Sequence, residues 1–227
     1  MNETSEKPAS LPASGTAPIN DCYSSGERTA MLRTQEWRGR LLKPLLQLFT
    51  RIGIKPDHLT VLSLLAGLGF CPLFFHSPGL ACVLLLIHAV LDGIDGPLAR
   101  FQNVASRRGS LTDTLADQIV VFATMLTLIS AEIVGLVPGG IYIFVYTLVV
   151  AFAMVRNALE IPYSWLVRPR FLVYCWIPVE LFLWPHTLPV LVITFDLLLS
   201  WKLLTGFSKL SRRLSEPECS ESTDRMN

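Results

Sequence analysis

Four aspartates, Asp92, Asp95, Asp113 and Asp117, lie close together in a chain of 227 residues, between segments that are otherwise strongly apolar. Ionised carboxylates are costly inside a membrane and repel one another, so their charge must be compensated. Arg100, in the same stretch, cannot neutralise four acids alone. Two divalent cations can, and a set of oxygen ligands favours Mg²⁺ or Mn²⁺, with Ca²⁺ as a non-productive substitute. The residue types therefore predict a site for two Mg²⁺ or Mn²⁺ ions.

The spacing of these acids predicts that they face one another. Asp92 and Asp95 stand three positions apart, Asp113 and Asp117 four apart, and both spacings place side chains on one face of a helix. Two antiparallel helices joined by a short loop would bring all four to a similar depth. A polar helix contact or a proton relay is the alternative interpretation of the same pattern.

The elements that position the acids are predicted from the hydropathy. Hydrophobic residues make up 51% of the chain, and residues 59–207 are mostly apolar. Stretches of about 20 apolar residues are long enough to cross a bilayer as helices. The sequence thus predicts an all-α integral membrane protein with six transmembrane helices. The expected spans are 57–75, 79–101, 109–132, 138–157, 171–184 and 187–206, of which the fifth is short.

The positions of Lys and Arg predict the orientation. They gather before the first span, between the second and third, between the fourth and fifth, and after the sixth, while the other connections have none. The positive-inside rule then places both termini in the cytoplasm. The acids lie near the cytoplasmic ends of the second and third spans, so we expect the active site on the cytoplasmic side.

The flanking segments differ from the apolar region. Residues 1–30 are rich in small and polar residues and are expected to be a disordered tail. Residues 31–54 carry apolar residues at helical spacing and are interpreted as an amphipathic helix on the cytoplasmic membrane surface, with a soluble amphipathic helix as the alternative. Residues 55–208 form the predicted transmembrane catalytic domain. Residues 209–227 form a predicted cytoplasmic polar tail.

The aspartates belong to a longer pattern of fixed spacing. It reads Asp92-x2-Asp95-Gly96-x2-Ala99-Arg100-x8-Gly109-x3-Asp113-x3-Asp117. This pattern resembles the signature of the CDP-alcohol phosphatidyltransferase family, and every fixed position of that signature is present. The resemblance covers roughly residues 50–207, and six spans with a preceding surface helix also fit the family.

The resemblance implies a role for each motif residue. Asp92, Asp95 and Asp113 would bind the metals, and Asp117 would act as the general base and also as a metal ligand. Gly96, Ala99, Arg100 and Gly109 would hold the CDP part of the donor. In "IKPDHLT", Pro56 and Thr60 fit a second family feature near the nucleotide, with Asp57 in place of Asn. Thr60 would then contact CDP, and Asp57 is alternatively a helix N-cap.

The family chemistry implied is metal-dependent transfer of a phosphatidyl group from CDP-diacylglycerol to the hydroxyl of a small polar alcohol, with release of CMP. Such a transferase acts in phospholipid biosynthesis. Its partners are the two substrates and the lipid bilayer, and nucleic acid is not expected. The resemblance also implies a homodimer.

The acceptor is predicted from the basic residues near the fourth and fifth spans. Arg156, Arg168 and Arg170 favour an anionic acceptor, such as the phosphorylated polyol glycerol 3-phosphate, although topology alone also places basic residues there. Inositol, inositol phosphate and serine stay open. So does transfer of phosphocholine or phosphoethanolamine from a CDP-alcohol to diacylglycerol. A cation transporter is the non-enzymatic alternative, but its acids should spread across the membrane.

Overall fold

The computed structural model describes residues 42–158 and 169–215, which form helices and short connections with no β-strand among them. The all-α membrane fold predicted from the sequence is confirmed. The predicted tail at 1–30, the start of the predicted amphipathic helix and residues 216–227 lie outside the described residues.

Seven helices make up this part of the chain. An N-terminal helix covers residues 42–52. The others are α2 (Pro56–Phe74), α3 (Pro78–Phe101), α4 (Arg107–Ser130), α5 (Leu136–Ala158), α6 (Pro169–Phe182) and α7 (Leu188–Ser215). The last helix continues beyond residue 208, where the polar tail was predicted to begin.

Five of the described helices, α2, α3, α4, α5 and α7, are long and apolar enough to cross a membrane. The exception, α6, has 14 residues and corresponds to the short fifth span predicted at 171–184. At 1.5 Å per residue it extends about 21 Å, less than the hydrocarbon core of about 30 Å. The sixth crossing therefore stays a prediction.

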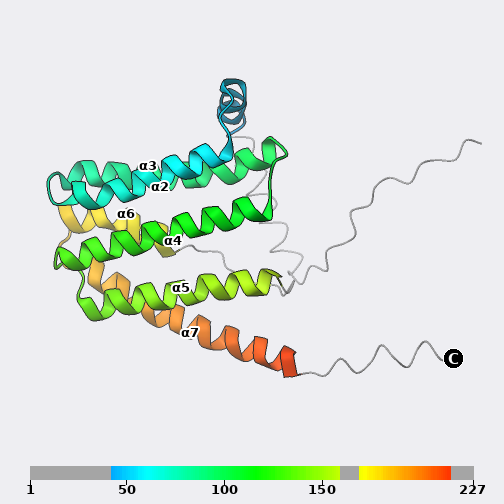
Figure 1. Ribbon diagram of the computed structural model, residues 1–227. Coiled ribbons are helices and arrows are strands. Elements are labelled where there is room, and N and C mark those ends of the chain that lie inside the picture. The colour runs from blue at the N-terminus through cyan, green and yellow to red at the C-terminus, as the bar shows by residue number, and fades with distance from the viewer. Residues whose placement is uncertain (1–41, 159–168, 216–227) are drawn as a thin grey trace, which may run out of the picture.

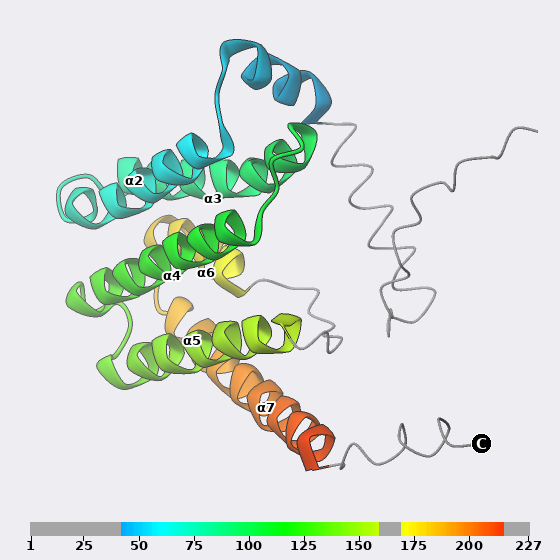
Figure 2. The same cartoon turned by 45° about the vertical axis from the view of Figure 1, so that its right-hand side comes forward.

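The helices lie roughly side by side, in a bundle whose order does not follow the sequence. In Figures 1 and 2, α2 and α3 form a pair, α4 lies beside them, and α5 and α7 lie on the far side of α4. The short α6 packs against α3 and α7. Buried apolar side chains from α2 to α7 form one continuous core that includes Phe70, Leu85, Met125, Ile177 and Leu199. This core holds together the helix ends that carry the acids.

Close approach of α2 to its neighbours depends on Gly67. A Cβ atom at this position would lie 2.6 Å from both γ carbons of Val120 on α4 and 3.2 Å from Nδ1 of His88 on α3. One turn earlier, the Ser63 hydroxyl lies 2.8 Å from Nδ1 of the buried His88 and donates to its carbonyl oxygen at 3.1 Å. Small residues thus let three helices meet next to Asp92.

The helix over residues 42–52 lies outside the bundle beside the start of α2, with its axis across the bundle (Figure 1). Its Leu46 is buried against Leu59 of α2 and Ile94 and Leu98 of α3. Its Ile52 is 64% exposed. A helix is thus present over residues 42–52 of the predicted segment 31–54, and its amphipathic role at the membrane surface stays a prediction.

The junction between α6 and α7 is organised by Glu180. Its buried carboxylate accepts hydrogen bonds from the backbone N–H groups of His186, Thr187 and Leu188, at 2.5, 2.8 and 2.6 Å. Leu188 is the first residue of α7, and its N–H group would have no partner inside the helix, while those of His186 and Thr187 belong to the turn that precedes α7. An acid is favourable there because it opposes the positive end of the helix dipole.

Replacing Glu180 by Gln is expected to destabilise the protein by about 2 kcal/mol, because hydrogen bonds to a charged acceptor are the stronger kind. Thermal unfolding in detergent measures the effect as a lower Tm. Glu132→Gln is the matched control, since Glu132 is an exposed acid in another helix connection. An equal Tm for the two variants would contradict the capping role.

Candidate functional site

The acids stand where α3 and α4 are joined by a short connection. α3 ends at Phe101, and Asn103 adopts a left-handed φ of 57° in the turn that follows. Ser106 caps α4, because its hydroxyl accepts the N–H of Gly109 at 3.0 Å. The connection reverses the direction of the chain, so α3 and α4 are antiparallel, as the sequence predicts. Their backbones pack against α2 rather than closely against each other, and the two helices meet through their acidic side chains.

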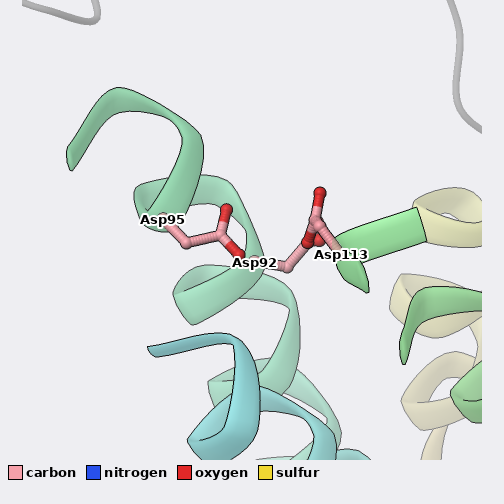
Figure 3. Close-up of side chains that lie close together, drawn as sticks. All are labelled: Asp92, Asp95 and Asp113. Atoms are coloured by element: carbon pink, nitrogen blue, oxygen red, sulfur yellow. The ribbon is translucent and has the colours of Figure 1, made fainter. Parts of the chain in front are cut away.

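The four aspartates meet between these helices. Oxygen atoms of Asp92, Asp95 and Asp113 all lie within 4.8 Å of one another. Figure 3 shows Asp92 and Asp95 on α3 and Asp113 on α4, with their carboxyl groups directed toward one another. Asp117, also on α4, is joined to this group because it and Asp92 are both paired with the guanidinium of Arg170. The predicted convergence of the four acids is confirmed.

The group of Asp92, Asp95 and Asp113, here called the acid triad, fits a metal site. It offers only oxygen donors, which suits Mg²⁺ or Mn²⁺ better than soft transition metals. The identity and number of the metals stay predictions. Asp117 is outside this triad, so its role as a ligand is also still a prediction.

The carboxylate of Asp95 is held from two sides. One oxygen accepts the backbone N–H of Gly96 at 2.6 Å, and the other accepts the hydroxyl of Thr60 at 3.1 Å. Thr60 on α2 was predicted to contact CDP, and the structure gives it a hydrogen bond to the acid triad. Such a partner fixes the orientation of a metal-binding carboxylate.

Arg170, at the start of α6, lies within the acid cluster. Its Nη2 is 2.8 Å from Oδ2 of Asp92, and its Nη1 forms an ion pair with Asp117. The side chain of Arg170 is only 4% exposed. The sequence predicted an acceptor-binding role for this residue and did not predict these ion pairs, because nothing in the sequence places α6 against α3 and α4.

A cavity of about 600 Å³ opens next to the triad. Its size is within the range of about 300–1,000 Å³ that is typical of small-molecule sites. All three triad aspartates line it, together with the predicted CDP-binding residues. These are Thr60, Gly96, Ala99, Arg100 and Gly109. The cavity thus joins both sets of motif residues, while their contacts with CDP remain a prediction.

Other residues of the cavity were not assigned by the sequence. Lys55, Ser106 and Ser110 line it beside Asp57. The N-cap of α2 is Lys55 and Asp57 is the second residue of the helix, so the alternative interpretation of Asp57 as the N-cap is wrong. Lys55 adds a positive charge to a cavity that already contains Arg100.

The remaining predicted site residues lie elsewhere. Asp117 and Arg170 are not among the residues that line the cavity. Arg156 is in the last turns of α5, and its side chain is outside the described part of the structure. Arg168 is outside it altogether. Their acceptor contacts remain predictions.

Comparison with known protein families gives a match over most of the bundle. The sequence model described as CDP-alcohol phosphatidyltransferase matches residues 54–206. This match includes the acid triad, Asp117, the cavity and every described helix from α2 to α6.

Curated relatives share parts of the chain. A CDP-diacylglycerol–serine O-phosphatidyltransferase of Mycobacterium tuberculosis is 34% identical over 110 residues, which cover 47% of this chain and 38% of the relative. A bifunctional IPC transferase and DIPP synthase of Aquifex aeolicus is 40% identical over 68 residues, which cover 30% of this chain and 16% of the relative. The chain thus matches less than half the length of these relatives.

The fold is shared with a solved structure. A phosphatidylinositol phosphate synthase of Mycobacterium tuberculosis, crystallised with CDP-DAG bound, superposes with a TM-score of 0.64 at 19% identity. The match covers 74% of this chain and 92% of that one. At this identity the likeness establishes the fold alone.

Proposed function

Because the chain belongs to the CDP-alcohol phosphatidyltransferase family, we propose that it transfers a phosphatidyl group from CDP-diacylglycerol to a small polar alcohol and releases CMP. The observation that carries this proposal is the cavity between α2, α3 and α4. Three clustered carboxylates and two basic side chains line it. This combination suits a pyrophosphate whose charge is shared between metal and cationic side chains.

The donor's CDP group occupies this cavity in the proposed complex. Gly96, Ala99 and Gly109 leave room for the nucleotide, and Arg100 pairs with phosphate. Asp92, Asp95 and Asp113 would hold Mg²⁺ or Mn²⁺, proposed as two ions per site. The bound metal supplies electrostatic stabilisation of charge on the phosphate oxygens and the leaving CMP. The acyl chains remain in the bilayer.

The acceptor hydroxyl attacks the lipid-side phosphorus. An oxygen–phosphorus bond forms to the acceptor, the bond from that phosphorus to CMP breaks, and the proton of the hydroxyl passes to Asp117. Asp117 lies one helical turn beyond Asp113 and shares the guanidinium of Arg170 with Asp92, which puts a base beside the triad. Its side chain keeps 11% of its surface exposed.

Serine is the acceptor that we propose first. The chain is 34% identical, over 110 residues, to a relative named for serine as its acceptor. Support for glycerol 3-phosphate, the acceptor predicted from the sequence, came from three arginines, of which Arg170 is engaged with aspartates. That acceptor is retained as the second candidate, since Arg156 and Arg168 would still suit a phosphate group.

We further propose that the cavity faces the cytoplasm and that both termini are cytoplasmic. Lys55, Arg100, Arg107 and Arg108 all lie at the helix ends around the cavity. Such basic residues favour the cytoplasmic side. A homodimer is also part of the proposal, on the basis of the family alone.

The test is CMP release by the purified full-length protein in detergent with CDP-diacylglycerol and Mg²⁺ or Mn²⁺. Serine, glycerol 3-phosphate, inositol and inositol 1-phosphate are supplied separately. We expect release with serine, its loss when EDTA removes the metal, and its return when excess Mn²⁺ is added. Release with glycerol 3-phosphate in place of serine would select the second candidate.

Failure with every acceptor, while radiolabelled CDP-diacylglycerol still binds, would contradict the proposed transfer reaction. CDP-choline with diacylglycerol is then the next pair of substrates to test, because the family signature also occurs in enzymes that transfer phosphocholine from a CDP-alcohol to diacylglycerol. Metal flux into proteoliposomes without CDP-lipid would instead favour the transporter.

A further inference from the structure

We propose that Arg170 is a positioning residue, which holds the carboxylate of Asp117 in the orientation needed to accept the acceptor's proton. This inference rests on the proposed function and assigns Arg170 a task different from the acceptor binding that the sequence predicted. Arg170 would exert its effect through Asp117, without touching either substrate.

The first support is the way in which the guanidinium bridges two acids. Nη2 contacts Asp92 at 2.8 Å and Nη1 contacts Asp117, so each terminal nitrogen serves a different carboxylate. A guanidinium is planar and rigid, and it therefore fixes the positions of both partners relative to each other. Asp92 belongs to the acid triad, so the bridge sets Asp117 against the proposed metal site.

The second support is the seclusion of Arg170. Its side chain is 4% exposed, against 11% for Asp117, and neither residue lines the cavity, so Arg170 is the more deeply buried of the two. On another side, the ring of Phe171 lies 4.8 Å from the guanidinium carbon. An acceptor beside the triad would therefore meet Asp117 before Arg170.

The third support is the balance of charge. Four carboxylates and one guanidinium leave three negative charges in the cluster. The permanent positive charge of Arg170 lies against Asp92 and Asp117 and offsets one of the negative charges, and the net negative charge that remains still favours binding of cations at the triad. Arg170 stays protonated throughout the proposed step, because the pKa of an arginine is too high for it to exchange protons.

These contacts predict an unusual combination of effects for Arg170→Met. We expect kcat for CMP release with serine to fall about a hundredfold, because a misplaced base of this kind has that order of effect. KM for CDP-diacylglycerol should not change, since Arg170 does not line the cavity. Mn²⁺, measured by EPR on the full-length protein, should bind at least as tightly as to the wild type.

A double-mutant cycle with Asp117→Asn separates positioning from a merely structural role. If Arg170 acts through Asp117, Arg170→Met should cause little further loss of kcat in the Asp117→Asn background. Arg170→Lys keeps the positive charge but loses the planar guanidinium that contacts two acids at once. Its kcat should therefore lie between those of Arg170→Met and the wild type. Because removal of one partner of a buried pair can prevent folding, Arg170→Lys alone decides the matter if the Met variant does not fold.

Three outcomes would overturn the inference. An equal fall of kcat with and without Asp117 would show that Arg170 does not act through it. A raised KM for serine with unchanged kcat would return Arg170 to acceptor binding. Loss of Mn²⁺ binding would assign it to the metal site. If the wild-type protein itself releases no CMP, the proposed function is contradicted instead. The wild type is therefore assayed first, before any variant is compared with it.

Discussion

Asp113→Asn is expected to lower CMP release by about a hundred- to ten-thousandfold, because metal stabilisation of the transition state contributes several kcal/mol and each 1.4 kcal/mol is about tenfold. Asp113 is the only triad member on α4, so its loss leaves α3 alone to bind the metal. We expect weaker Mn²⁺ binding in EPR titrations and weaker binding of CDP-diacylglycerol in Mn²⁺.

Asp196→Asn is the control for the loss of a buried acid. Asp196 is 7% exposed on α7 but belongs neither to the acid triad nor to the cavity. This variant should retain Mn²⁺ binding and CMP release within about twofold of the wild type. If Asp113→Asn behaved like Asp196→Asn, the acid triad would not be the metal site.

Asp117→Asn is expected to lower kcat by about a hundred- to ten-thousandfold, the usual contribution of a general base. An amide occupies the same space as the carboxylate but does not accept the proton. Because Asp117 does not line the cavity, donor affinity and Mn²⁺ binding by the triad should persist. Steady-state kinetics with serine, combined with equilibrium binding of CDP-diacylglycerol, measures both effects.

Asp113→Asn and Asp117→Asn should therefore differ in their effects on Mn²⁺ and donor binding. One acid supports metal and donor binding, and the other supports only the chemical step. Loss of Mn²⁺ binding in Asp117→Asn as severe as in Asp113→Asn would make Asp117 a metal ligand, as the family resemblance also allows. Unchanged kcat would exclude it as the base.

The sequence predicted the helix pair that carries the acids because that part of the structure is local. The i, i+3 and i, i+4 spacings fix the faces of α3 and α4, and a short connection makes them antiparallel. The same reasoning brings Gly96, Ala99 and Arg100 to the cavity, since they follow Asp95 on the same helix. Thr60 was found only through the family pattern.

Contacts between distant helices could not be predicted in this way. Arg170 is separated from Asp92 by 78 residues, and hydropathy does not specify which helices become neighbours. The sequence analysis therefore identified only Arg100 as a positive charge near the four acids, whereas the structure adds Arg170 from α6. The role of Glu180 could not be predicted either, because its partners are backbone N–H groups, which no residue type in the sequence reveals.

The two ends of α6 carry different tasks, and this has a mechanical consequence. Arg170 holds the acids at one end, and Glu180 fastens the other end to α7. The helix between them has 14 residues and is about 21 Å long, and Pro178 removes one of its backbone hydrogen bonds close to Glu180. We therefore expect a substitution that loosens the α6–α7 junction to shift Arg170 as well, without any change in the residues that line the cavity.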